Sequence, residues 1–253
     1  MNKIQLPVRT SNGTASNGMS KGIIYYTDNK LGEPIFSVVQ KRILAAGLPI
    51  ISVSLKPIGL GKNIVLNLSP GFITMLKQIA RALQESESDY VFFCEHDVLY
   101  PTSHFDFTPL RDNIFYYNAN VWRWKYPDNL AVTYDRLISL SGLCVNRKFA
   151  LSHYKMRLKK IEDMGWDTDK RHEPDWARKW GYEPGTKKIK RGGFSDDEFE
   201  TWISKYPIID IRHGKTFSQS KVTLDSFIHP PTNWRETSLD KTPGWNLMEL
   251  FNL

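Results

Sequence analysis

Cysteine is scarce in this chain, and long apolar runs are absent. The two cysteines among 253 residues, Cys94 and Cys144, lie in apolar stretches, so we expect buried free thiols and a reducing compartment. No apolar run approaches the roughly 20 residues that a membrane helix needs, which predicts no membrane span. The amino terminus shows no secretory signal pattern, and a cytoplasmic location is therefore expected.

Several short catalytic motifs are missing as well. The sequence has no P-loop and no GxGxxG string, which argues against ATPases and dinucleotide-dependent oxidoreductases. It has no HExxH motif and no Cys/His zinc spacing, so a zinc hydrolase is poorly supported. A hydrophobic content of 41% with 13% aromatic residues is nevertheless sufficient for a packed core.

The net charge of +7 is concentrated in one segment. Residues 155–191 hold twelve Lys or Arg against seven Asp or Glu, together with Trp166, Trp176 and Trp180. Such a segment could bind a phosphate backbone or stack on sugars. A charged, solvated surface is the better explanation for most of its lysines.

The first half of the chain alternates strand and helix patterns. Strands are expected at 22–29, 48–55 and 63–68 and from Tyr90, with helices starting at Pro34 and Ser69-Pro70. This order predicts an α/β fold with a mixed, mostly parallel sheet flanked by helices, in a single domain over residues 22–253. Residues 1–21 have no hydrophobic period and are expected to be a flexible segment.

The second half is less regular. We expect strands at 114–124, 130–133 and 137–145, a helix over about 147–162, a short helix opening at 195–198 and a strand at 207–211. The chain beyond is expected to be irregular.

The strand that begins at Tyr90 ends in Glu95-His96-Asp97. Because side chains alternate along a strand, Glu95 and Asp97 should share a face and His96 should point away. Two carboxylates facing one space at the end of a buried strand suggest a divalent cation between them. The alternative is that the strand has reached water and its charges are solvated. His213, after the last strand and beside Arg212 and Lys215, is the expected third ligand, while His96, His104 and His172 are weaker choices.

An acidic cluster follows a Gly-Gly pair near the end of the chain. Ser195 and Glu198 have the spacing of a capping box. Asp196 and Asp197 are not needed for that cap, so one of them is a candidate general base, although acids in the first turn of a helix are also favoured electrostatically.

Two further groups could contribute to the same crevice at the carboxyl ends of the strands. Thr27, Asp28 and Asn29 end the first strand and could bind a base or ribose, or could form an Asx-type turn. Lys77 and Gln78 lie on the helix that precedes the acidic strand.

Taken together, these residues resemble a GT-A-fold glycosyltransferase, over roughly residues 22–215. Glu95-His96-Asp97 stands where that family has its DxD-type motif, although the first acid is Glu, and Thr27-Asp28-Asn29 stands at the nucleotide-binding loop. Lys77-Gln78 lies near the family's Arg-Asn pair, and the segment 140–147 resembles the strand before the acceptor-side helix. The resemblance implies a nucleotide-sugar-binding half, 22–101, and an acceptor-binding and catalytic-base half, 102–253.

The same resemblance implies the chemistry. A nucleotide-diphosphate sugar would bind through Mn²⁺ or Mg²⁺ held by Glu95, Asp97 and His213. Thr27, Asp28, Asn29, Lys77, Gln78, His96 and Lys215 would contact the donor. Asp197 or Asp196 would activate a glycan or other hydroxyl acceptor in an inverting reaction, and Trp122, Trp124 and Trp166 are candidates for stacking on sugars.

Other functions fit parts of the sequence. A sugar-phosphate nucleotidyltransferase would share the sheet and the acidic pair, but residues 27–32 are a poor glycine-rich loop. A nucleic-acid-binding protein would use the basic segment 155–191. A glycosyltransferase acting on a hydroxylated base in DNA would combine both features. The sequence does not indicate an oligomeric state.

Overall fold

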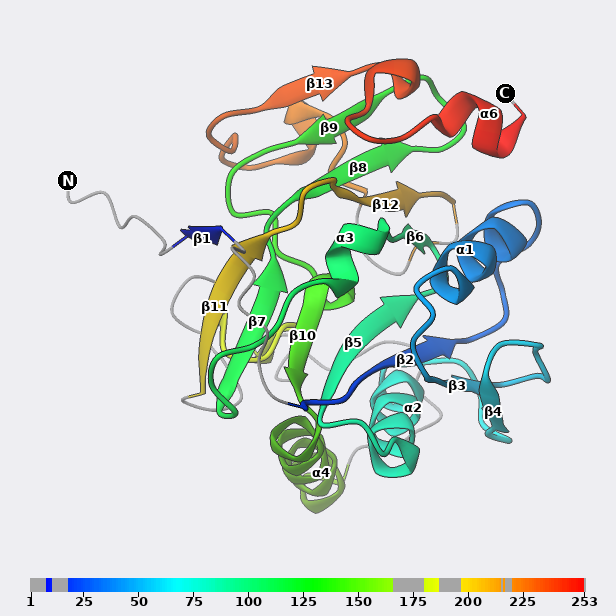
Figure 1. Cartoon of the computed structure of the whole chain (residues 1–253), viewed down its shortest axis with the longest axis vertical. Coiled ribbons are helices and arrows are strands. Elements are labelled where there is room, and N and C mark those ends of the chain that lie inside the picture. The colour runs from blue at the N-terminus through cyan, green and yellow to red at the C-terminus, as the bar shows by residue number, and fades with distance from the viewer. Residues whose placement is uncertain are drawn as a thin grey trace.

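The protein has a mixed α/β fold built on two β-sheets, of eight and five strands (Figure 1). The structure is a computed structural model that describes residues 8–10, 18–165, 180–186, 197–214, 216 and 220–252. The predicted α/β class, with a mostly parallel sheet flanked by helices, is confirmed. The second sheet was not expected from the sequence.

The eight-stranded sheet is mostly parallel. Strand β10 runs antiparallel to both of its neighbours, β5 and β7, while every other pair is parallel. In spatial order the strands are β1 (Val8–Thr10), β11 (Glu198–Ile203), β7 (Ile114–Asn118), β10 (Leu143–Asn146), β5 (Tyr90–Glu95), β2 (Lys21–Thr27), β3 (Ile50–Ser54) and β4 (Lys62–Val65).

The five-stranded sheet is mostly antiparallel. Strands β8 and β12 run parallel to each other, and the other three pairs are antiparallel. In spatial order the strands are β13 (Arg235–Thr237), β9 (Ala131–Thr133), β8 (Val121–Lys125), β12 (Ile208–Arg212) and β6 (Val98–Leu99).

The chain passes between the two sheets at three short connections. Strand β5 leads through residues 96–97 into β6, β7 leads through 119–120 into β8, and β11 leads through 204–207 into β12. Because β7 pairs with β11 and β8 pairs with β12, two neighbouring strands continue side by side from one sheet into the other. The backbone N–H of Ile211 donates to the carbonyl of Asp97 at 2.9 Å and fastens the first connection to β12.

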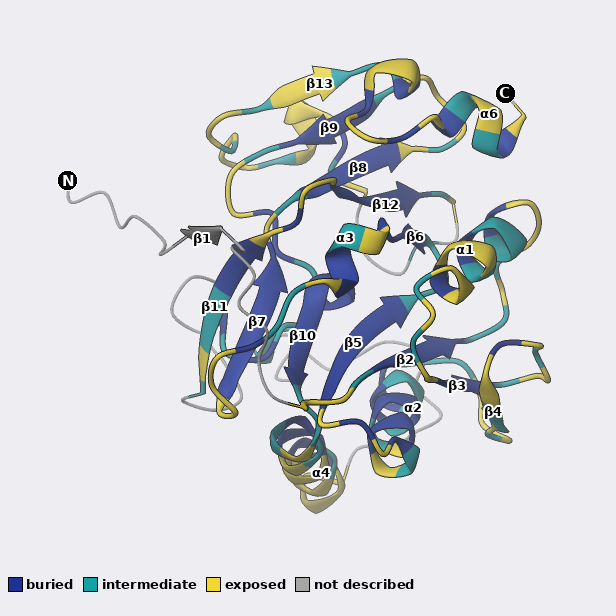
Figure 2. Ribbon diagram, in the orientation of Figure 1, coloured by how far each residue is buried: buried dark blue, intermediate teal, exposed yellow. Residues whose placement is uncertain are grey.

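Helices cover both faces of the eight-stranded sheet, and the alternation of side chains along β2 shows how. Ile24 and Tyr26 pack with α2 (Phe72–Glu85) and α4 (Arg147–Asp163). Ile23 and Tyr25 point to the other face, where α1 (Ile35–Leu44), α6 (Leu247–Phe251) and the five-stranded sheet pack. The central strands are therefore buried on both faces (Figure 2).

The other helices of the described residues are short. They are α3 (Thr102–Phe105) and the 3₁₀ turns Leu140–Gly142, Leu224–Ser226 and Leu239–Lys241. Among the described residues, no helix has both the length and the apolar character needed to cross a membrane. Cys94 and Cys144 are free and buried, as expected.

Five expectations from the sequence differ from the structure. The helix expected after residue 195 is wrong for 198–203, which form β11 between β1 and β7; its Phe, Thr, Trp and Ile residues are strand formers. The expected strand 114–124 is two strands, because the chain changes sheets at 119–120. Residues 140–142 are a 3₁₀ turn rather than strand. The segment after 215 holds β13 and α6, and Val8–Thr10, within the expected flexible segment, pairs with β11.

His104 is a structural histidine in the core, near the connection between β7 and β8. Its side chain is 0% exposed and is surrounded by aromatic rings, namely those of Phe92, Tyr100, Phe105 and Trp202. The Asn118 amide lies 3.1 Å from its Nδ1. Burial lowers the pKa of His104 to about 3, so the ring is neutral in the folded protein at ordinary pH.

The buried, neutral ring of His104 predicts an acid-sensitive stability. Because the pKa is lower in the folded than in the unfolded chain, the stability is complete above pH 6.5 and falls as the pH drops towards 3. Between pH 7 and pH 5, His104 alone should account for a loss of about 2 kcal/mol in the free energy of unfolding. Urea unfolding of the wild type and of His104→Leu at both pH values measures it. Equal pH dependence in the two proteins would contradict the assignment.

Candidate functional site

A cavity of about 340 Å³ opens between the two sheets. Its wall combines the end of β5, the end of β12, the middle of β8, the turn before β10 and the segment 180–186. The lining residues are Met75, Glu95, Asp97, Arg123, Ile138, Ser139, Leu140, Ser141, Tyr182, Glu183, Asp210, Arg212, Thr216 and Lys221. Ligands commonly bind beyond the carboxyl ends of parallel strands, and β5 and β12 both end here.

A cluster of possible metal ligands lies at this edge. His96, Asp97 and His213 each offer a ligand atom, and these atoms all lie within 4.8 Å of one another. The Nε2 atom of His213 is 3.4 Å from Oδ2 of Asp97. The structure therefore brings together Asp97 and His213, the two residues that were predicted to bind one metal ion. Asp97 also forms part of the cavity wall.

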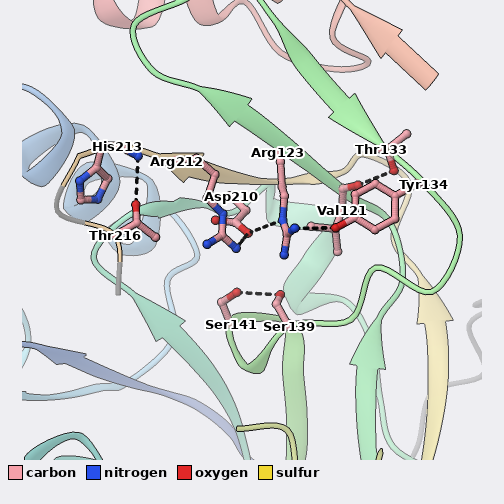
Figure 3. Close-up of polar contacts among 10 residues, drawn as sticks. All are labelled: Val121, Arg123, Thr133, Tyr134, Ser139, Ser141, Asp210, Arg212, His213 and Thr216. Atoms are coloured by element: carbon pink, nitrogen blue, oxygen red, sulfur yellow. Dashed lines mark hydrogen bonds and ion pairs between the residues drawn. The ribbon is translucent and has the colours of Figure 1, made fainter. Parts of the chain in front are cut away.

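Both histidines of this cluster are held in place by threonines. Nδ1 of His96 is 2.8 Å from the hydroxyl of Thr27. The backbone N–H of His213 donates to the hydroxyl of Thr216 at 3.0 Å, which fixes the turn after β12 (Figure 3). The contact to Thr27 is of the kind that orients a histidine ring before a metal binds, whereas the contact to Thr216 fixes the backbone at His213.

The orientation of His96 differs from the expectation. Alternation along the strand predicted that His96 would point away from Asp97, but β5 ends at Glu95 and residues 96–97 form a turn. The turn brings His96 and Asp97 to the same side. His96 is therefore placed among the possible ligands, whereas Glu95, predicted as a ligand, is not part of the cluster.

Glu95 lines the cavity beside the cluster. Its Oε1 accepts a hydrogen bond of 2.6 Å from the hydroxyl of Tyr26. Burial, followed by the nearby charge of Asp97, raises the pKa of Glu95 to about 8. A carboxyl group that is held neutral by burial and crowding would be returned to its charged form by a cation next to it.

Asp97 behaves differently. Burial alone would raise the pKa of its carboxyl group, but the hydrogen bond from His213 and the charges of His96, His213 and Arg212 bring the pKa below its usual value. Asp97 is thus the carboxylate that stays ionised in this group, which is the state that a metal ligand requires.

A buried ion cluster lines the cavity next to these ligands. One oxygen of Asp210 on β12 accepts from Nε of Arg123 at 3.3 Å and from the guanidinium of Arg212 (Figure 3). Asp210 and Arg123 are opposite each other in the β8–β12 register. Burial alone would lower the pKa of Arg212, but Asp210 raises it above the usual value. One carboxylate shared by two guanidinium groups leaves positive charge facing the cavity.

The predicted nucleotide-binding residues at the end of β2 already have partners in the protein. Asn29 accepts from the backbone N–H groups of Leu55 and Lys56 at 2.8 and 2.9 Å. Asp28 accepts from the backbone of Lys30 at 3.1 Å, and Thr27 contacts His96. The alternative interpretation, an Asx-type turn, describes Asp28, whereas the side chain of Asn29 joins this turn to residues 55–56.

Gln78 is a buried structural residue. Its side-chain amide donates to the carbonyls of Thr27 and Val53, at 2.7 and 3.2 Å, and so fastens α2 to the ends of β2 and β3. Lys77 is half-buried on the same helix, and neither residue lines the cavity.

Asp197 is also removed from the cavity wall. Its carboxylate lies 2.9 Å from Nδ1 of the buried His153 on α4, and it is not among the residues that line the cavity. Asp196 and Lys215 lie outside the described residues, as do His172, Trp166 and most of the basic segment 155–191.

The proposed sugar-stacking tryptophans have other surroundings. Trp124 is completely buried, donates to the carbonyl of Asp128 and packs edge-on against Phe251. Trp122 is buried beneath the guanidinium of Arg235. Trp124 is therefore a core residue.

Sequence reasoning missed Arg123, Asp210 and Glu183, which line the cavity. A signal for two of them was present. Arg123 interrupts the apolar strand around Trp122 and Trp124, and Asp210 interrupts a run of isoleucines. A charge in the middle of each of two apolar strands indicates an ion pair between them.

A metal titration tests the ligand cluster. In Asp97→Ala we expect the affinity for Mn²⁺ to fall by more than about 100-fold, beyond the loss typical of outer-shell changes, because the ionised ligand is removed. In Glu95→Gln the affinity should change by less than about tenfold. Isothermal titration with MnCl₂ measures both, with Asp128→Asn, an exposed carboxylate paired to Lys125, as the matched control. Equal losses in Glu95→Gln and Asp97→Ala would show that Glu95 is a ligand after all.

Comparisons with known proteins give only weak likenesses. No family model and no curated protein matches the sequence. A glycosyltransferase involved in the glycosylation of the major capsid of PBCV-1 has a TM-score of 0.40 and 10% identity, over 72% of this chain and 81% of that one. The apo form of the glycosyltransferase GlyE from Streptococcus pneumoniae TIGR4 has a TM-score of 0.36 and 12% identity, over 62% of this chain and 41% of that one. Likenesses at this level do not identify a function.

Proposed function

We propose that this protein is a metal-dependent glycosyltransferase that moves a sugar from a nucleotide-diphosphate sugar to a hydroxyl acceptor. The observation that carries the proposal is the His96–Asp97–His213 cluster, which adjoins a cavity that Arg123 and Arg212 also line. A divalent cation and guanidinium groups facing one cavity suit a diphosphate, since both neutralise phosphate oxygens. The sequence resemblance to GT-A enzymes agrees with this arrangement.

The donor set favours one of the two expected metals. Two imidazoles and one carboxylate form a mixed nitrogen and oxygen set, whereas Mg²⁺ prefers oxygen ligands and several waters. Mn²⁺ therefore fits better, although the same set also suits Fe²⁺ or Zn²⁺. When bound, the cation would neutralise the leaving diphosphate.

The residues of the chain have separate tasks in this proposal. Arg212 and Arg123 would pair with phosphate oxygens from the β12 and β8 side. Ser139 and Ser141, whose hydroxyls are 2.9 Å apart on the cavity wall, would donate to the donor sugar or its phosphates. Thr27 would orient His96. The nucleoside would pack against the turn at Asp28 and Asn29.

Glu183 is the proposed general base, in place of Asp197 or Asp196. Glu183 is a carboxylate on the described part of the cavity wall, in the segment 180–186, and it lies outside the His96–Asp97–His213 cluster. An inverting transfer needs one carboxylate to take the proton of the acceptor.

Two alternatives find less support. A nucleotidyltransferase would be expected to have a glycine-rich loop after the first strand, but the turn after β2 is short and tied to Leu55 and Lys56 by Asn29. Nucleic-acid binding would use the basic segment 155–191, of which the structure describes 155–165 and 180–186. There, Arg157 is buried under the rings of Phe72 and Trp180 and is not exposed to a phosphate backbone.

Hydrolysis of the donor tests the proposed function without a known acceptor. We expect the protein to release nucleoside diphosphate slowly from at least one of a panel of nucleotide sugars with Mn²⁺, and not with EDTA, because water can replace the acceptor. Asp97→Ala should abolish the release, and Asp128→Asn should retain it. Silence across the panel, without any donor-induced thermal shift, would remove the proposal and favour a binding protein.

Two acid substitutions separate the candidate bases. In Glu183→Gln we expect kcat for transfer to fall by about 10² to 10⁴, the usual contribution of a general base. In Asp197→Asn, which keeps a hydrogen-bonding group beside His153, kcat should change by less than about tenfold. Steady-state transfer kinetics on the donor found above give both values. A large loss in Asp197→Asn alone, with the fold intact by circular dichroism, would return the role to Asp197.

A further inference from the structure

Three aromatic side chains form a cluster on the five-stranded sheet, at the side of the cavity. The rings of Tyr134 and Trp234 are nearly parallel, with centroids 5.5 Å apart and an angle of 8° between their planes. Phe227 meets both rings edge-on, at 5.2 and 6.0 Å. All three side chains are partly exposed, so this aromatic cluster is not a closed core.

The sheet itself positions the aromatic cluster. Tyr134 follows β9 and Trp234 precedes β13, and the antiparallel register that pairs Thr133 with Arg235 places the two rings opposite each other. One oxygen of Asp135 accepts from Thr232 and Asn233, at 2.9 and 2.7 Å, and closes the end of this strand pair. The rings are therefore presented in a fixed arrangement before any ligand arrives.

The aromatic cluster is continuous with the cavity. The hydroxyl of Tyr134 accepts a hydrogen bond from Arg123, which lines the cavity (Figure 3). Nζ of Lys221, another lining residue, lies 5.2 Å from the centroid of Phe227. A molecule that reached the cavity from this side would lie against the aromatic cluster.

The surroundings indicate the chemistry of that molecule. Residues 221–241, which supply Phe227 and Trp234, hold three basic residues, Lys221, Arg235 and Lys241, against three acidic ones, Asp225, Glu236 and Asp240. This segment has no net charge with which to attract a polyphosphate backbone. Aromatic faces with hydrogen-bonding groups around them suit a neutral ligand that is apolar on one side and polar at its edges.

We propose that the aromatic cluster binds the saccharide part of the acceptor, a neutral, polyhydroxylated chain whose C–H faces lie against Trp234 and Phe227. This inference rests on the proposed function, which it deepens by assigning the class of acceptor. It also assigns the sugar-stacking role, which the sequence suggested for Trp122 and Trp124, to residues in a segment that was expected to be irregular. Ile228, 88% exposed beside Phe227, would extend the apolar contact.

Direct binding tests the inference independently of catalysis. The wild-type protein is titrated calorimetrically with neutral gluco-, galacto- and manno-oligosaccharides, and with duplex DNA at low salt. We expect at least one oligosaccharide to bind, and Trp234→Leu and Phe227→Leu each to weaken it by about tenfold or more, because the aromatic face is lost while apolar volume is kept. Tyr206→Ala, an exposed aromatic residue outside the aromatic cluster, is the matched control.

The outcomes distinguish this inference from the proposed function. Donor hydrolysis without any oligosaccharide binding would overturn the saccharide assignment and leave the glycosyltransferase standing. Oligosaccharide binding unchanged in both leucine variants, or DNA binding in place of saccharide binding, would overturn it as well. Saccharide binding that depends on Trp234 would support it even if hydrolysis of every donor failed. Thermal melts of each variant confirm that it is folded.

Discussion

The candidate site depends on the point at which β5 ceases to be a strand. Tyr90–Glu95 is paired within the eight-stranded sheet, and Val98–Leu99 is paired within the other sheet. The two residues between them must turn, and the hydrogen bond from Ile211 to the carbonyl of Asp97 fixes that turn against β12. His213 follows the same β12 strand, so one junction brings all three possible ligands together.

Much of the fold was predictable because the first half of the chain carries its information locally. The apolar faces of α1 and α2 and the apolar runs of β2, β3 and β5 are periodic over enough residues to identify each element. The second half is decided by contacts distant in sequence. Strand β11 is a strand because β7 and β1 lie on either side of it, and six residues are too few for periodicity to distinguish a strand from a helix turn.

The site was predictable to a similar extent. Asp97 and His213 could be paired because each follows the end of a strand and carries a group that metals bind. His96 was placed on the wrong side because alternation was extended two residues beyond the end of the strand. In the sequence, Gln78 and Asn29 look like ligand-binding residues. Nothing local shows that the side-chain amide of Gln78 donates to Val53, or that the side chain of Asn29 accepts from Leu55 and Lys56. Polar side chains at strand ends also satisfy backbone N–H and C=O groups, and do not need a ligand to account for them.

The pair of strands that continues from one sheet into the other has a mechanical consequence. Parallel ladders join β7 to β11 in the eight-stranded sheet and β8 to β12 in the five-stranded sheet. Between the two ladders, where both chain segments pass from one sheet to the other, the amide of Asn118 donates to the hydroxyl of Ser204. Sliding or swinging one sheet against the other would break both ladders at once. The two walls of the cavity therefore form a single stiff frame, and adjustment to a substrate falls to the side chains and connections at its rim.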